Sequence, residues 1–293
     1  MSEARNFNRS YIENELHKLD TKLSKKTTLH VAGGAAMAFY GLKEATKDID
    51  VIVRSETQRD SLVQALHDMS YSEPGRVTAI YAQMEATATL ENQDGFRWDV
   101  FNRIVAHKLS LSRNMITRSQ RVLTSGRLEV RLLSKEDIFL LKSVTDRERD
   151  LEDMGIVAES GIDWKIVAAE CSSQAAESTM IWEDALCDRL TQLREKRGIV
   201  SPIEKNICRI ADKKIAEKWI IEKVEAGAET VNNLAKESGE PERIIRNVIR
   251  ELVRKKVLAV DRSTRPHRFT LRKTKSKMVN SFHNKGSNQK TAT

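Results

Sequence analysis

Two aspartates one residue apart, Asp48 and Asp50, are the side chains of this sequence best placed to do chemistry. They begin an apolar segment, residues 48–53, that has the composition of a β-strand. Successive side chains of a strand point to opposite faces, so both carboxylates share one face while Ile49 and Val51 share the other. Carboxylate oxygens fixed on a rigid element suit Mg²⁺ or Mn²⁺. The segment is therefore a candidate catalytic and metal-binding strand.

A glycine pair, Gly33 and Gly34, lies between a short apolar run at residues 29–32 and an alanine-rich helical stretch at residues 33–42. Without side chains the backbone can approach a phosphate, and a helix that starts there offers its first N–H groups. We predict that the pair binds the phosphates of a nucleotide. The alternative is a tight strand-to-helix turn without a ligand, which the nearby aspartates disfavour because buried carboxylates without a cation are costly.

The order of these residues resembles the DNA polymerase beta-like nucleotidyltransferase superfamily. Ala32-Gly33-Gly34 is followed by thirteen residues and then by Asp48-Ile49-Asp50-Val51, a spacer at the long end of the usual range. With Gly41 and Thr46, the string looks like the minimal prokaryotic branch that includes nucleotidyltransferases of toxin–antitoxin systems. The resemblance implies an Mg²⁺- or Mn²⁺-dependent enzyme that moves a nucleoside monophosphate from an NTP, such as ATP, to an RNA (tRNA-like) or protein acceptor.

A third carboxylate, Asp99, lies in the second of two predicted strands, residues 84–90 and 96–105, which a turn at residues 91–95 joins. The superfamily commonly carries its third carboxylate on a neighbouring strand, and by resemblance Asp99 takes that place. A third oxygen ligand would hold a second metal or serve as the general base. The predicted catalytic and metal-binding set is therefore Asp48, Asp50 and Asp99.

Residues 142–153 resemble another segment of the same branch, a Lys followed by an Arg and then by Arg-or-Lys–Asp–Leu–x–Asp. By that resemblance Lys142 is a candidate contact of the triphosphate, while Arg149 and Asp150 orient the segment through an ion pair. The residues alone allow a different interpretation, a solvated helix face at residues 147–153 with ion pairs three and four residues apart.

The C-terminal part has the element order of a winged helix-turn-helix. A long helix at residues 202–227 precedes a short helix from Thr230, a turn, a strongly amphipathic helix at residues 242–256, and two short strands at residues 257–261 and 269–271. Arg and Asn side chains contact both base edges and phosphates. The candidate nucleic-acid contacts are Arg243, Arg246, Asn247, Arg250, Arg254 and Arg265. Alternatively, the arginines form a solvated helix face, or the unit binds a protein.

The expected fold class is α+β, with a nucleotidyltransferase core of a mixed β-sheet flanked by helices, a helical subdomain and a C-terminal winged helix. The predicted ranges are an N-terminal helix at 1–28, the core at 29–135, the helical subdomain at 136–198, the linker helix and winged helix-turn-helix at 199–272, and a disordered basic tail at 273–293.

The charge is uneven, because residues 201–293 carry 22 Lys and Arg against 11 Asp and Glu. A basic C-terminal third indicates a polyanionic partner, RNA or DNA, although a merely solubilising tail has the same composition. A second function therefore stays open, a DNA-binding transcriptional regulator whose nucleotidyltransferase-like domain senses a nucleotide or is inactive. A third is a structural, antitoxin-like partner of one protein.

The remaining composition predicts a cytoplasmic protein. No apolar run approaches the roughly 20 residues of a membrane span, and the N-terminus lacks the apolar core of a signal peptide. The three cysteines, Cys171, Cys187 and Cys208, are far apart and have no ligand at metal-site spacing. We expect reduced thiols, without a zinc site or a disulfide.

Overall fold

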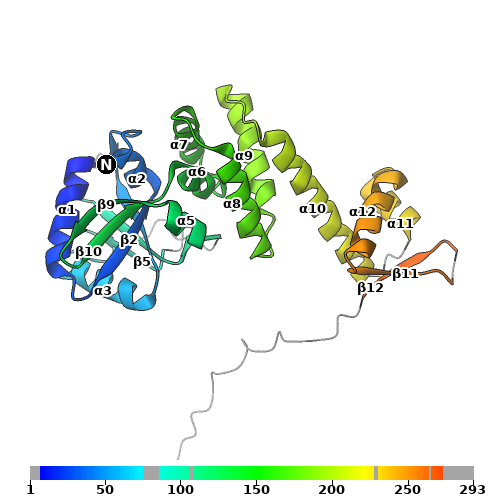
Figure 1. Ribbon diagram of the computed structural model, residues 1–293, viewed down its shortest axis with the longest axis horizontal. Coiled ribbons are helices and arrows are strands. Elements are labelled where there is room, and N and C mark those ends of the chain that lie inside the picture. Colours follow the sequence, from blue (N-terminus) through cyan, green and yellow to red (C-terminus); the bar gives the residue numbers. More distant parts are fainter. Residues whose placement is uncertain (1–6, 75–85, 106–107, 228–229, 264, 273–293) are drawn as a thin grey trace, which may run out of the picture. The chain divides into compact units, whose positions relative to one another are not determined.

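The computed structural model describes residues 7–74, 86–105, 108–227, 230–263 and 265–272 (Figure 1). It contains two compact units, Met1–Asp212 and Lys213–Thr293, which divide inside one helix, α10 (Glu204–Glu225). The sequence analysis instead begins its linker helix and winged domain at residue 199. The predicted basic tail at 273–293 lies outside the described residues.

The first unit is built on a mixed six-stranded sheet with the order β5-β6-β4-β2-β10-β9. β4 and β6 pair in parallel, as do β2 and β10, and the other neighbours are antiparallel. The fold class is therefore α+β, as predicted. The strands are β2 (Thr27–Ala32), β4 (Asp48–Val53), β5 (Ala88–Glu91), β6 (Arg97–Asn102), β9 (Gln120–Ser125) and β10 (Leu128–Leu132).

Three helices pack with this sheet and share its apolar core (Figure 1). They are α1 (Arg9–Lys22), α2 (Gly33–Phe39) and α3 (Glu56–His67). Helix α1 buries Ile12, Leu16 and Leu19 at helical spacing, which confirms the predicted N-terminal helix. Side chains cap two of the helices, since Asn8 accepts from the backbone of α1 and Ser55 from that of α3.

A group of four helices follows the sheet: α6 (Lys135–Ser143), α7 (Glu148–Glu159), α8 (Trp164–Ala176) and α9 (Trp182–Arg197). Ser134 caps α6 by accepting from the N–H of Asp137. The described part of the unit also contains shorter elements: β1 (Phe7–Asn8) paired with β3 (Ala45–Thr46), β7 (Ile104–Val105) paired with β8 (Leu109–Ser110), and α5 (Arg113–Arg118).

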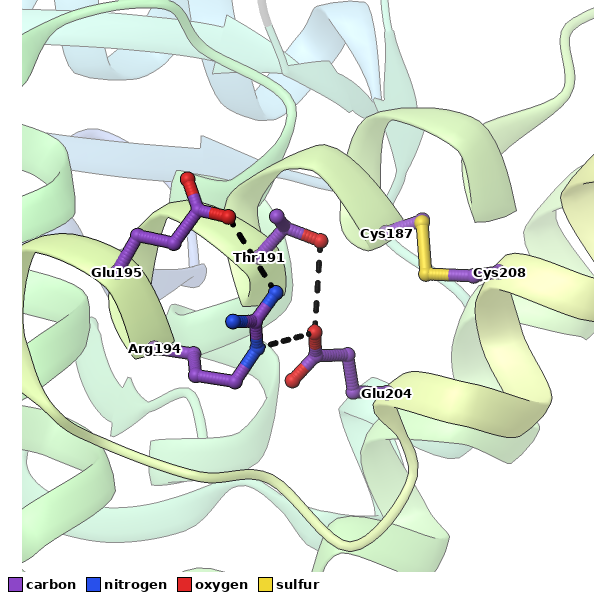
Figure 2. The surroundings of a disulfide bond; sticks show 6 residues. All are labelled: Cys187, Thr191, Arg194, Glu195, Glu204 and Cys208. Atoms are coloured by element: carbon purple, nitrogen blue, oxygen red, sulfur yellow. Dashed lines mark hydrogen bonds and ion pairs between the residues drawn. A yellow bond between two sulfur atoms is a disulfide. The ribbon is translucent and has the colours of Figure 1, made fainter.

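A disulfide joins Cys187 of α9 to Cys208 of α10 (Figure 2). The expectation of three reduced thiols is therefore wrong for these two, while Cys171 is free and buried. Gly198 ends α9 at a φ of +69°, a conformation that glycine adopts without steric cost, and the chain turns into α10. The turn brings together two cysteines that are 21 residues apart in sequence.

The second unit has its own apolar core, which includes Ile220, Leu234, Ile249 and Phe269. Its elements after α10 are α11 (Val231–Ser238), α12 (Glu242–Arg254), β11 (Leu258–Asp261) and β12 (Arg268–Leu271), with the two strands antiparallel. The order is the one expected of a winged helix-turn-helix, and that assignment stays a prediction. Within α12, Ile245 and Ile249 are buried in this core, whereas Ile244 is 41% exposed.

None of the helices in the described parts of the chain is both long and apolar enough to cross a membrane.

Candidate functional site

The three predicted carboxylates lie on one face of two parallel strands, β4 and β6. Asp48 pairs in register with Arg97, and Asp50 pairs with Asp99. Because side chains alternate along each strand, all four charged side chains point to the same face of the sheet. The strand alternation used in the sequence analysis is sufficient to explain this placement.

Arg97 lies between two of these carboxylates. Its Nη2 donates to Asp48 Oδ2 at 2.7 Å and to Asp99 Oδ2 at 2.8 Å, and its Nε donates to both Asp99 oxygens at 3.1 Å. The hydroxyl of Thr46 donates to Asp48 Oδ1 at 3.4 Å, and the hydroxyl of Thr89 donates to Asp99 Oδ1 at 2.9 Å. The sequence analysis assigned no role to Arg97, although its position two residues before Asp99 places it on the same face.

Because Arg97 lies between Asp48 and Asp99, these carboxylates face a guanidinium group. Across the residues that the structure describes, no group of three or more His, Cys, Asp or Glu side chains is assembled to hold a metal ion. Asp48 and Asp99 are only 8% and 2% exposed, so the guanidinium of Arg97 is their main cationic neighbour.

Asp50 differs from the other two carboxylates because it is half-buried against the glycine pair. A Cβ on Gly33 would lie 1.9 Å from Asp50 Oδ2, and Gly33 has a φ of +60°, so only glycine fits here. Burial, with repulsion from Asp48 and Asp99, raises the pKa of Asp50 to about 7. Gly33 therefore makes room for a carboxylate that is readily protonated near neutral pH.

A pocket of about 410 Å³ opens beside Asp50. Asp50, Gly33 and Ala32 form one end of it. Its apolar lining comes from β6, β7, α6 and the residue that caps α6, with Phe101, Val105, Ile138, Leu141 and Val144. The volume and the mixture of an apolar wall with a few charged groups are typical of small-molecule sites.

Lys142 also lines this pocket, but its charge is already matched. Its Nζ lies 2.9 Å from Asp150 Oδ1 and 2.7 Å from Asp153 Oδ2, and Lys43 also pairs with Asp153. Burial alone would raise the pKa of Asp150, but the Lys142 charge and hydrogen bonds hold this pKa well below its usual value. The role of Lys142 as a triphosphate contact stays a prediction.

The alternative of a solvated face at residues 147–153 is wrong for two of its residues, because Asp150 and Asp153 are 1% and 3% exposed. The expected partner of Asp150 is also corrected. Lys142 and Arg147 pair with Asp150, whereas Arg149 is exposed. Spacing along the sequence is consistent with the Arg147–Asp150 pair, which is three residues apart, but it could not show Lys142, which lies on another helix.

The turn between α6 and α7 supplies further polar lining of the pocket, including Thr145 and Arg147. Arg147 Nε lies 2.6 Å from Asp150 Oδ2. Arg189 of α9 is buried below this turn and donates from Nε to the carbonyl of Thr145 at 2.8 Å and from Nη2 to that of Arg147 at 3.4 Å. Lys108 reaches the carbonyl of Val144 from the other side. Sequence reasoning missed Lys108 and Arg189, which contact the turn only through the folded packing.

Residues 10–194 match the family described as nucleotidyltransferase of unknown function (DUF6036). The chain belongs to this family. The match includes the three carboxylates, Arg97 and the whole lining of the pocket. No curated protein matches the chain.

The predicted nucleic-acid contacts belong to the second unit, which lies beyond the DUF6036 match. The six residues are exposed: Arg243, Arg246, Asn247, Arg250, Arg254 and Arg265. A groove of about 900 Å³ runs between α12 and the β11–β12 hairpin, and three of its lining residues are Arg246, Arg250 and Arg265. Arg262 and His267 of the hairpin also line it. The structure therefore gathers part of the predicted set into one basic groove, and Arg243, Asn247 and Arg254 lie outside its lining.

Proposed function

We propose that this DUF6036 protein is a metal-dependent nucleotidyltransferase that moves a nucleoside monophosphate from an NTP to an acceptor. One observation carries the proposal: a pocket with an apolar wall ends at Asp50, on the sheet face that also bears Asp48 and Asp99. The family description supports the reaction class. The metal, the NTP and the acceptor are our proposals.

The pocket suits the two chemically different parts of a nucleotide. Phe101, Ile138 and Leu141 offer apolar surface on which a base can pack. Lys108 and Arg147 also line the pocket, and their positive charge would attract a polyphosphate, with Asp150 as the present partner of Arg147. Gly33 and Gly34 stay candidates for backbone contacts to the phosphates, with Lys142 as a further cation.

The carboxylates have the donor chemistry that Mg²⁺ or Mn²⁺ requires. Two of them already hold a cation, the guanidinium of Arg97, and Asp50 lies one register position away on the same face of the sheet. The residues therefore fit a divalent ion, which we assign to Asp48, Asp50 and Asp99. When bound, such an ion would neutralise phosphate charge and polarise the phosphoryl group.

In the proposed reaction an acceptor hydroxyl attacks the α-phosphate in line, a new P–O bond forms, and the bond to the departing pyrophosphate breaks. The protein contributes mainly position and charge. Asp99 would either hold a second metal near the acceptor hydroxyl or accept the hydroxyl proton as the general base. The apolar residues of the pocket would exclude water from the nucleobase of the NTP. Arg189 fixes the turn that carries Arg147.

For the acceptor we favour an RNA with a tRNA-like end or a side chain of a partner protein, in a toxin–antitoxin setting. The resemblance of the Gly33–Asp50 string to that branch and the basic groove of the second unit support this choice. Neither names the acceptor molecule.

The test is a transfer assay with labelled NTPs, Mg²⁺ or Mn²⁺, and a pool of cellular RNA and protein. We expect wild type to label one component, and Asp48→Ala with Asp50→Ala to reduce the label to the level without protein. Asp60→Ala is the matched control, an acid of α3 whose side chain is 65% exposed. Equal labelling by wild type and the double variant, or no labelling under any metal and NTP, would contradict the proposal.

The basic groove favours a second candidate, a DNA-binding regulator whose first unit senses a nucleotide. This function requires salt-dependent binding to duplex DNA that is lost in Arg243→Ala with Arg250→Ala and Arg254→Ala. Asp48 and Asp50 would be dispensable for it. Fluorescence anisotropy with a labelled duplex separates the two candidates.

A further inference from the structure

The guanidinium of Arg97 takes up the space between Asp48 and Asp99. It contacts Asp48 Oδ2 at 2.7 Å and Asp99 Oδ2 at 2.8 Å with the same nitrogen, Nη2. The Arg97 side chain is only 9% exposed, and the Asp48 and Asp99 side chains are 11% and 3% exposed. These charged groups form a buried, bidentate arrangement rather than a surface ion pair.

Such a cluster is costly to leave incomplete. When one partner of a buried ion pair is removed, the other charge is left without a counter-charge in a low-dielectric environment. Here two carboxylates depend on Arg97, and Asp50 adds a third negative group one register position away on β4. Without a cation in this place the carboxylates would repel one another or take up protons.

A divalent ion that bound Asp48 and Asp99 together would need the oxygens that Arg97 now contacts. Oxygen ligands lie about 2.0–2.6 Å from Mg²⁺ or similar ions, so the ion would stand where Nη2 stands. Two cations cannot share that position, because they repel one another and Arg97 contacts Asp48 Oδ2 and both oxygens of Asp99. Binding of the ion therefore requires Arg97 to leave.

We propose that Arg97 is an internal counter-ion that competes with the divalent metal for Asp48 and Asp99, so that metal entry and release of the Arg97 guanidinium are one exchange. Arg97 is thus a positioning residue whose hydrogen bonds hold the two carboxylates in place until the metal replaces it. The inference rests on the metal site of the proposed function. Beyond that site, the inference adds an exchange of the Arg97 guanidinium for the ion, and this exchange lowers the affinity of the protein for the metal.

Direct binding of Mn²⁺ alone, measured by isothermal titration calorimetry, tests the exchange. Arg97→Gln removes the competing charge, and we expect it to bind Mn²⁺ about tenfold more tightly than wild type. Asp48→Asn and Asp99→Asn in the same background should abolish the gain. Arg59→Gln is the matched control, since Arg59 pairs with the exposed Asp60 at 2.7 Å on α3. Equal or weaker binding by Arg97→Gln overturns the inference, as does absence of binding in both proteins.

Thermal unfolding supplies a second measurement on the same variants. Without metal, Arg97→Gln should unfold at a lower temperature than wild type, and saturating Mn²⁺ should raise its unfolding temperature more than that of wild type. A merely structural role for Arg97 would lower the unfolding temperature equally with and without the ion, and that result also overturns the inference.

The wild-type protein tests the exchange if Arg97→Gln does not fold. The Nε–H resonance of Arg97, assigned by its absence in Arg97→Lys, should be protected from exchange without metal. Saturating Mg²⁺ should shift it and speed its exchange with water. A resonance that stays in place and protected overturns the inference. Because these experiments use the metal without a nucleotide, their failure is distinct from failure of the labelled-NTP assay.

Discussion

The pocket of the first unit and the groove of the second both carry many charged side chains, but these side chains differ in burial and in pairing. Around the pocket, Arg97 and Lys142 are buried and paired with aspartates. In the groove, Arg262 and Arg265 are exposed, and neither makes an ion pair with any residue that the structure describes. The groove does contain one ion pair, Arg246 with Glu242 at 2.6 Å, but both side chains are exposed. The two regions therefore differ in the burial of their charges.

The difference indicates where each region meets its partner. Buried pairs hold carboxylates and cations in fixed positions at a high desolvation cost, which suits a site that must be organised before its small ligand arrives. Exposed arginines cost the fold little and create a positive field that attracts a polyanion from outside. The pocket is therefore suited to position a small ligand, and the groove to attract a large one.

The largest expected effect is the loss of a buried charge beside the pocket. Lys142→Met leaves Asp150 and Asp153 without their shared cation, and we expect a loss of about 3–5 kcal/mol of unfolding free energy. Denaturant unfolding measures it. Lys196→Met is the matched control because Lys196 makes an exposed pair with Glu148, worth at most about 1 kcal/mol. Similar losses in both variants would remove the contrast between buried and exposed charges.

A second effect concerns His30, which is fully buried in β2. Burial, with the nearby charge of Arg131, lowers the pKa of His30 to about 4 from its usual 6.5. Between these values the unfolded chain binds a proton that the folded chain does not, so stability falls as the pH drops from 6.5 towards 4. The His30 contribution to this fall is up to about 3 kcal/mol.

The difference between wild type and His30→Leu isolates that contribution, because other titrating groups cancel. Unfolding free energies of both proteins at pH 7 and at pH 4.5 provide the measurement. Wild type should lose stability relative to the variant on acidification. If the unfolding free energies of the two proteins changed equally with pH, the interior of the first unit would accommodate an unpaired positive charge. That result would contradict the conclusion that charges of the first unit must be paired when they are buried.

The smallest expected effect is the loss of one exposed arginine from the groove. Arg265→Ala should leave unfolding unchanged within about 0.5 kcal/mol. It should weaken nucleic-acid binding for all sequences and reduce the slope of log affinity against log salt by about 1. Lys236→Ala on α11 is an exposed control outside the groove lining. An unchanged salt slope in Arg265→Ala would mean that the groove does not contact phosphates.

Local patterns in the sequence predicted the elements of the fold and part of the site. Alternation along β4 and β6 places Asp48, Asp50 and Asp99 on one face, and the capping signals of Ser134 and Thr230 mark the starts of α6 and α11. The same alternation could have identified Arg97. These features depend on spacing within one strand or one helical turn, which a sequence displays directly.

The remaining contacts depend on packing between segments far apart in the chain. Lys142 pairs with Asp153 only because α6 and α7 lie against each other, and Arg189 reaches Thr145 across 44 residues. The burial of Asp150, contrary to the solvated-face alternative, has the same origin. No local pattern reports which helix faces meet, so the partners of these charges could be found only in the folded structure.

The disulfide between Cys187 and Cys208 has a practical consequence for proteolysis and for shortened forms of the chain. Cleavage near Gly198, between the two cysteines, would yield fragments that migrate apart on a denaturing gel only after reduction. A polypeptide shortened to the family match at residue 194 would lose Cys208 and retain Cys187. The orphaned thiol, on a partly exposed face of α9, would crosslink such molecules into covalent dimers under oxidising conditions.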